Sequence, residues 1–314
     1  MAVVETGTTP TPKVGVRPRG ASRRDGWQRR LPLLPALIYI VVVTQIPFVV
    51  TLWYSFQSYF FDIPGGAHFN GFSNYSTVFT NAAFRSALLR SVVMTASAVI
   101  VAMVLGVAFA VLLDRKFLGR GVVRTLIITP FLVMPAAAAL VWAGPMLDPS
   151  FGLLNYLLQP FGVNHVAWLS THALGSVIVV MIWQWTPFMT LIVLAGLQSQ
   201  PSDTLEAAKV DGAGALATFR ELTLPHLRPY IELGILLGSI YLVNVFDAVR
   251  LMTNGGPGTS TTNLPFYLYQ QVNYAFDVGG AAAAGVVTVI LTIIVATFAL
   301  RMFARVFQFE EAGV

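Results

Sequence analysis

The sequence lacks cysteine and carries little charge. None of its 314 residues is cysteine, which excludes disulfides, thiolate metal sites and cysteine nucleophiles. Charged residues make up only 11% of the chain, whereas ordinary soluble domains carry about 25%. Hydrophobic residues make up 56%. A soluble chain of this length would need more charge to cover its surface, so the composition indicates a membrane protein.

Patterns that would support covalent chemistry are also missing. The glycine-rich run at 255–258 is not followed by Gly-Lys-Ser/Thr, and no Walker A sequence occurs anywhere in the chain. The four histidines are scattered over different loops, and neither paired carboxylates nor a metal-spaced cluster is present. We therefore predict that the chain is not an enzyme and holds no metal or cofactor of its own.

Six long apolar segments predict six membrane-spanning helices, since a helix needs about 20 mostly apolar residues to cross a bilayer. Several contain proline or glycine, which helices in a bundle tolerate. The predicted spans cover about residues 33–56, 91–113, 122–142, 174–197, 231–252 and 281–300. The fold class is thus an all-α membrane bundle over residues 33–305. A basic, disordered tail at 1–32 precedes it and a short tail at 306–314 follows it.

Lys and Arg are divided unevenly between the two sides of this bundle. Of the 19 basic residues, 16 fall on the side of the two tails and of the loop at 201–229. Only Arg85, Arg90 and Arg250 fall on the other side. Cytoplasmic loops carry the excess of positive charge, so both termini and the 201–229 loop are predicted to be cytoplasmic. The basic tail could also suggest nucleic-acid binding, but the spans make that improbable and we predict no nucleic-acid partner.

The 201–229 loop is predicted to form two helices joined by a turn. Ser202 and Asp203 are candidate N-cap residues for the first helix. Gly212 and Gly214 permit a sharp turn, because glycine lacks a Cβ. A second helix over 215–224 should be interrupted or ended by the proline that follows it.

This loop resembles the EAA loop of ABC importer permeases. That family shows EAA, three residues, Gly, nine residues, an aliphatic residue, any residue and Leu-Pro. The matching residues here are Glu206, Ala207, Ala208, Gly212, Leu222, Leu224 and Pro225. The resemblance implies a coupling helix that docks on a cytoplasmic ATPase subunit, with Glu206 as one contact. ATP and Mg would then bind on the partner ATPase subunits.

Polar residues inside the apolar segments are candidates for a substrate pathway, because such groups are costly in a membrane. Gln184 in the fourth span either bonds another helix or faces a polar cavity. Tyr241, Asn244 and Asp247 follow one another at steps of three in the fifth span. They offer an aromatic ring, an amide and a carboxylate on one side of a helix. For Asp247, an ion pair with Arg250 is the competing interpretation.

The segment NVFDAVRLMTNGGPGTST, residues 244–261, resembles a signature of carbohydrate importer permeases: N-x-F-D, five residues, then T-x-G-G-P. Further matches to that family occur at residues 69–87 and 119–158. The resemblance implies a permease subunit in the bacterial inner or plasma membrane that translocates a sugar or polyol. It also implies three kinds of partner: a second permease, two ATPase subunits and an extracytoplasmic solute-binding protein.

Other transport functions stay open at this point. The chain could be a permease for a different solute such as glycerol phosphate, although the spans lack the basic cluster that an anion would favour. An ion-coupled secondary transporter is a weaker alternative, because it usually has more spans and no EAA loop. A membrane enzyme or receptor subunit would need a catalytic or ligand constellation in the spans.

Overall fold

The described part of the protein is almost entirely helical. The computed structural model describes residues 31–163 and 165–311. Contacts divide the chain into two units, residues 1–50 and residues 51–314. The first unit contains the 3₁₀ turn η1 (Leu31–Leu33) and most of α2 (Leu34–Tyr54), which corresponds to the first predicted span. Nearly all of the predicted basic tail at 1–32 and the last residues of the 306–314 tail lie outside the described residues.

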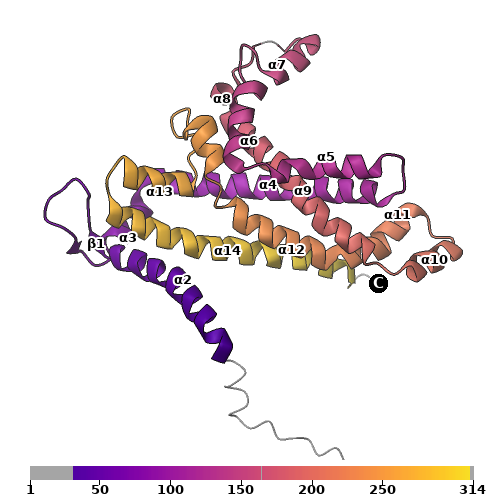
Figure 1. Cartoon of the computed structure of the whole chain (residues 1–314), viewed down its shortest axis with the longest axis horizontal. Helices are drawn as coiled ribbons and strands as arrows, with labels where there is room; N and C mark the ends of the chain where they lie inside the picture. Colours follow the sequence, from indigo (N-terminus) through magenta and orange to yellow (C-terminus); the bar gives the residue numbers. More distant parts are fainter. Residues whose placement is uncertain (1–30, 164, 312–314) are drawn as a thin grey trace, which may run out of the picture. The chain divides into compact units, whose positions relative to one another are not determined.

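Four long helices organise the second unit: α4 (Ala82–Asp114), α9 (Ala173–Gln198), α12 (Leu224–Leu242) and α14 (Val278–Glu311). Figure 1 shows α4, α9, α12 and α14 extending between the two ends of this unit, with the chain in α12 running opposite to its direction in the other three. Helices α4 and α9 make the most extensive contact of this unit. Gly106 allows their close approach, since a Cβ there would lie 2.6 Å from Met189 Cβ. The core between the helices contains Met94, Ala98, Ala102, Val180, Met189 and Ile235.

The third predicted span is a bent pair of helices. α5 (Arg120–Leu132) and α6 (Pro135–Val141) meet at an angle of 100°. Val133 and Met134 have extended ψ angles of 131° and 133°, and Pro135 begins α6. A proline disfavours helical backbone in the residue before it, so the break falls where the sequence places Pro135. A π-helical turn, η2 (Trp142–Met146), continues α6.

Shorter elements connect these helices. β1 (Gln57–Ser58) and β2 (His68–Phe69) form an antiparallel pair, with Gln57 opposite Phe69. At the end of the bundle where α4 begins and α14 starts lie α3 (Ser73–Thr80), η5 (Val249–Thr253) and α13 (Leu264–Asn273). A hairpin beyond η2 carries α7 (Leu153–Leu158), η3 (Gln159–Phe161) and α8 (Trp168–Thr171). The other end carries α10 (Ser202–Val210), α11 (Ala215–Thr218) and η4 (Phe219–Thr223).

The structure supports four or five of the six predicted spans by length and composition. Within the described residues, α2, α4, α9 and α14 are long and apolar enough to cross a membrane, and the bent pair is a fifth candidate. α12 does not qualify: it includes the ion pair of Arg228 and Glu232 (2.9 Å) and ends at Leu242, well before the predicted end at Met252. The six-span count therefore stays a prediction.

Candidate functional site

The 201–229 loop forms two helices and a turn. α10 ends before Gly212, whose φ of +83° is a left-handed conformation that favours glycine. One expectation about this loop is wrong. Pro201 occupies the N-cap position and makes no side-chain cap, so Ser202 and Asp203 lie inside the helix instead of capping it. For Pro225, the expected interruption is found and not the expected end: the helical run from Ala215 changes from α11 to the π-helical turn η4 just before the proline and continues as α12.

Several charged side chains of this loop face outward and have no partner among the residues that the structure describes. Of the matched residues, Glu206, Ala207 and Gly212 are exposed, whereas Ala208 is buried. Five charged side chains are exposed and, among the residues that the structure describes, have neither a hydrogen bond nor an ion pair: Glu206, Lys209, Asp211, Arg220 and Glu221. Large apolar side chains are exposed beside them, with Val210 at 88% and Leu216 at 80%. The loop therefore presents a mixed charged and apolar surface that is not used internally.

The four predicted pathway residues lie together in one pocket of about 230 Å³. Gln184 comes from the middle of α9, Tyr241 from the last turn of α12, and Asn244 and Asp247 from the segment that follows. The other lining residues are Pro135, Met181, Trp185, Val245, Phe246 and Ala248. None of the lining residues is Lys or Arg. The pocket thus combines amide, carboxylate and aromatic groups with apolar walls.

Gln184 both bonds another helix and faces a cavity, so the two alternatives for this residue coexist. Its Nε2 donates a hydrogen bond of 3.1 Å to the carbonyl oxygen of Val133. That carbonyl lies at the break between α5 and α6, where the helical hydrogen-bond ladder is interrupted. The bond satisfies a backbone group that would otherwise be costly in an apolar environment. Gln184 therefore both supports the bend between α5 and α6 and lines the pocket.

Two stacked aromatic rings form another wall of the pocket. Tyr241 was expected from the sequence, whereas its partner Trp185 was not. The rings of Trp185 and Tyr241 are stacked, with centroids 5.5 Å apart and planes inclined by 30°. The Trp185 ring also lies edge-on to Phe131 and Phe188. Tyr241 is 58% exposed, so this ring keeps a free surface. The signal in the sequence was the position of Trp185 directly after Gln184, but only the fold shows which tryptophan of WQW meets Tyr241.

The predicted spacing required the pathway residues of the fifth span to lie on one continuous helix. In the structure they do not. The α-helix ends at Leu242 and the chain bends at residues 243–246. The predicted stripe is divided accordingly: Gly234 and Gly238 are buried against Met103 and Met189, whereas the residues beyond Leu242 turn toward the pocket. The carbonyl groups of the last turn are bonded within the bend itself, by the backbone N–H groups of residues 243–245 and by the Asn244 side chain.

The ion pair between Asp247 and Arg250 is not formed. The Arg250 Nη1 donates to Asn254 Oδ1 at 2.6 Å, and the guanidinium lies 5.4 Å from the centre of the Tyr269 ring. Asn244 Nδ2 donates to the Ile240 carbonyl at 2.8 Å. Asp247 has neither a hydrogen bond nor an ion pair in the described part of the chain. Its carboxylate is therefore available to whatever enters the pocket.

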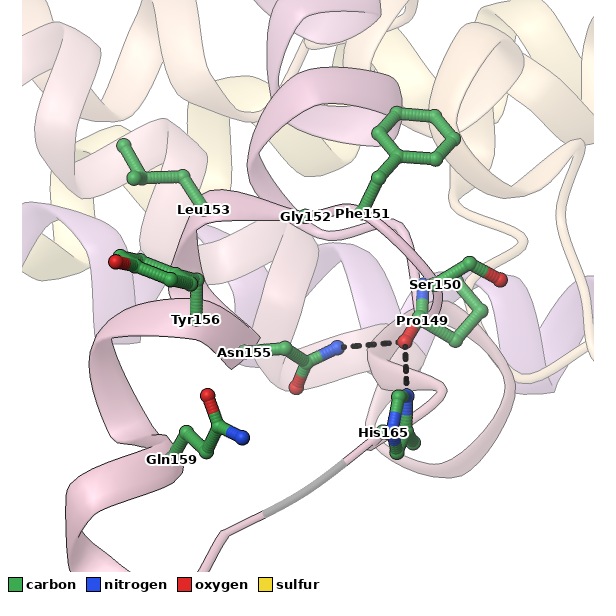
Figure 2. Close-up of a pocket in the computed structure, with 9 residues that line it drawn as sticks. All are labelled: Pro149, Ser150, Phe151, Gly152, Leu153, Asn155, Tyr156, Gln159 and His165. Carbon is green, nitrogen blue, oxygen red and sulfur yellow. Dashed lines mark hydrogen bonds between the residues drawn. The ribbon is translucent and has the colours of Figure 1, made fainter.

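A second hollow, of about 270 Å³, lies in the hairpin that carries α7 (Figure 2). Buried Asn155 holds the hairpin together: its Nδ2 donates to the carbonyls of Asp148 and Val166, and its Oδ1 accepts from Val166 N and Trp168 Nε1. Figure 2 shows Asn155 and His165 both directed at the Pro149 carbonyl. Every bond of this amide is internal, so it serves the hairpin's own structure.

The loop and the pocket occupy opposite ends of α12. Leu224 and Pro225 begin this helix and Tyr241 lies in its last turn. Its 19 residues correspond to about 28 Å at 1.5 Å per residue. The structure thus joins the predicted pathway residues to one another and keeps them far from Glu206, with one helix running from the loop to the pocket.

Comparisons with known proteins agree on one family. The model described as "Binding-protein-dependent transport system inner membrane component" matches residues 102–308. A probable ABC transporter permease protein, y4oQ of Sinorhizobium fredii, is 40% identical and covers 83% of this chain and 84% of its own length. The trehalose/maltose transport system permease protein MalF of Thermococcus litoralis is 34% identical, with 84% and 89% covered.

Among solved structures, a bacterial ABC transporter involved in the import of the acidic polysaccharide alginate has a chain with a TM-score of 0.75. The match covers 90% of this chain and 96% of that one at 22% identity. At that identity the likeness concerns the fold alone.

Proposed function

Because the chain belongs to the family of binding-protein-dependent transport system inner membrane components, we propose that it translocates a sugar or polyol as the permease subunit of an ABC importer. The sugar class is supported by the relative named for trehalose and maltose and by the residues 244–261 that resemble the carbohydrate-importer signature. The substrate crosses the bacterial cell membrane through the pocket beside α12.

The observation that carries this proposal is the convergence of Gln184, Tyr241, Asn244 and Asp247 on one pocket. A sugar presents hydroxyl groups that both donate and accept hydrogen bonds, and apolar ring faces that pack on aromatic side chains. Amides offer donors and acceptors, and a carboxylate accepts. The stacked Trp185 and Tyr241 supply the aromatic surface. Small-molecule sites commonly combine apolar walls with a few polar groups that fix orientation.

The charge of the pocket argues against an anionic solute such as glycerol phosphate. Asp247 lines the pocket and the lining contains no Lys or Arg. Arg250, the nearest basic residue in sequence, is directed to Asn254 and Tyr269. A phosphate would therefore meet a carboxylate without a compensating cation. An ion-coupled secondary transporter would have no use for the 201–229 loop.

The 201–229 loop couples this pocket to ATP hydrolysis on a partner. Its exposed charges and its exposed Val210 and Leu216 form a surface suited to another protein. The partner is a cytoplasmic ATPase subunit that meets Glu206, and ATP and Mg bind there. The assembly contains a second permease, two ATPase subunits and an extracytoplasmic solute-binding protein. This chain contributes the passage and performs no hydrolysis of its own.

Reconstitution in vesicles tests the proposal. The chain alone should neither hydrolyse ATP nor accumulate labelled trehalose or maltose. Together with its second permease, ATPase subunits and binding protein, it should accumulate a sugar in an ATP-dependent manner. Accumulation by the isolated chain under an ion gradient would show a secondary transporter and overturn the proposal.

A further inference from the structure

We propose that Asn263, which lies outside the pocket lining, is the positioning residue that holds the bend carrying Asn244 and Asp247 in place. The inference rests on the proposed pathway and deepens it by naming what fixes the pocket's polar groups. Asn263 is only 2% exposed and directly precedes α13. Its Nδ2 donates to the carbonyl oxygen of Val245, in the middle of the bend.

The same amide ties the bend to a helix. Asn263 Oδ1 accepts a hydrogen bond of 3.1 Å from Phe266 N and so caps the start of α13. A buried amide that bonds both elements fixes their separation, because losing either bond would leave a buried polar group unpaired. Aromatic packing reinforces the link, since the Phe246 ring lies 5.3 Å from Tyr269 and 6.2 Å from Phe266.

The two threonines before Asn263 bond to the chain on the other side of Asp247, at residues 255 and 256. Thr261 and Thr262 are buried, and their hydroxyl groups donate to the carbonyls of Gly256 and Gly255 at 3.1 and 3.2 Å. Gly255 has a φ of +81°, and a Cβ there would lie 2.5 Å from the Phe266 ring. Residues 261–263 therefore bond to both sides of the segment that contains Asp247.

The start of α13 is in turn attached to the bundle. Leu264 N donates to Ser91 Oγ of α4 at 2.7 Å, and this bond does not touch the bend. The pocket's polar groups are thus held from outside by Asn263, and α13 stays in place mainly through its packing against α4 and α14, with the Ser91 bond as an addition. In the absence of the Asn263–Val245 bond, the bend has fewer restraints, and Asn244 and Asp247 lose their defined direction.

Thiol labelling tests this positioning without knowledge of the substrate. The chain has no cysteine, so N244C places a single reporter on the bend. Asn263→Ser keeps an oxygen able to cap α13 but is too short to reach Val245, and Asn263→Asp keeps the cap oxygen but loses the donor. In the assembled importer, either change should alter the rate of N244C modification by a water-soluble maleimide about fivefold or more, toward faster labelling.

Two controls separate positioning from general loosening. Ser91→Ala removes the neighbouring bond at the start of α13 and should leave the N244C rate unchanged. A second reporter, S170C on the α7 hairpin, should respond to none of these changes. If both Asn263 variants leave the N244C rate unchanged, or if Ser91→Ala accelerates it equally, Asn263 has no positioning role.

Uptake of trehalose and maltose by the same importers distinguishes this inference from the proposed pathway. Asn263→Ser should change the ratio of the two uptake rates, and adding it to Asn244→Ala should change the ratio little further, because Asn263 acts through the bend. If the effects of Asn263→Ser and Asn244→Ala on the ratio are fully additive, the role of Asn263 is overturned and the proposed pathway is not. If Asn244→Ala has no effect on the ratio, the pathway is wrong, whereas the labelling result still decides the role of Asn263.

Discussion

The 201–229 loop and the pocket beside α12 contain similar polar residues but hold them in different ways. In the loop, Glu206, Lys209, Asp211, Arg220 and Glu221 are exposed and, within the described chain, without partners. In the pocket, Gln184 and Asn244 each bond a backbone carbonyl, and the bend is held by Asn263. The proposed function accounts for this difference: a loop that another protein completes needs no internal partners, whereas a pocket for a small molecule needs its polar groups held in place.

The strongest test asks whether the loop and the α7 hairpin, which follows the pocket-lining helix α6 along the chain, lie on opposite sides of the membrane. Ser170, on the α7 hairpin, and Ala215, at the start of α11, are both exposed. In intact cells, a membrane-impermeant maleimide should label S170C and not A215C, because the Lys and Arg distribution predicts a cytoplasmic loop. After permeabilisation both should be labelled. Equal labelling in intact cells would contradict the proposed orientation.

Loss of coupling should be the next largest effect. Glu206→Lys reverses an exposed charge, and Gly212→Val forces a Cβ into a left-handed backbone, which costs about 1–2 kcal/mol. Both variants should insert normally, lose uptake and bind the ATPase subunits weakly, as measured by co-purification.

Gly214→Val is a matched control for the turn. A Cβ would meet no atom within 4 Å at either Gly212 or Gly214, but Gly214 has a φ of −69°, which valine adopts readily. This variant should retain more uptake than Gly212→Val. Wild-type uptake by both Glu206→Lys and Gly212→Val would mean that the resemblance of the loop to the EAA pattern has no functional meaning.

The comparison also explains how much the sequence revealed. The loop was predictable because its features are contiguous: the glycine at the turn and the exposed charges of α10 all lie within one short stretch. The pocket was predictable only as separate polar residues. Pro135 joins it through the 100° bend between α5 and α6, and Trp185 through its stacking on Tyr241 of α12; spacing along the chain reveals neither arrangement. The bend after Leu242 was missed because the apolar run continues through it.

Pocket variants should change selectivity while leaving coupling largely intact. Asn244 is exposed at the pocket, and one hydrogen bond to a sugar hydroxyl contributes about 0.5–1.5 kcal/mol, so Asn244→Ala should shift the ratio of trehalose to maltose uptake. Trp185→Ala and Tyr241→Ala should do the same by removing the stacked platform. ATP hydrolysis stimulated by the binding protein should largely survive in all three. Unchanged uptake kinetics and preference in these variants would place the pathway on another face or in the second permease.

Asp247→Asn should give the smallest effect, because it keeps the shape of the side chain and removes only its charge. Asp247 has no ion-pair partner in the described chain, so the variant should reach the membrane in normal amounts and change only the uptake ratio. Arg250→Gln is the matched control. It removes the bond to Asn254 and the contact with Tyr269, so it should lower the amount of protein more than it alters preference. If Asp247→Asn instead lowers the amount of protein and leaves preference unchanged, the carboxylate supports the fold and not the passage of a sugar.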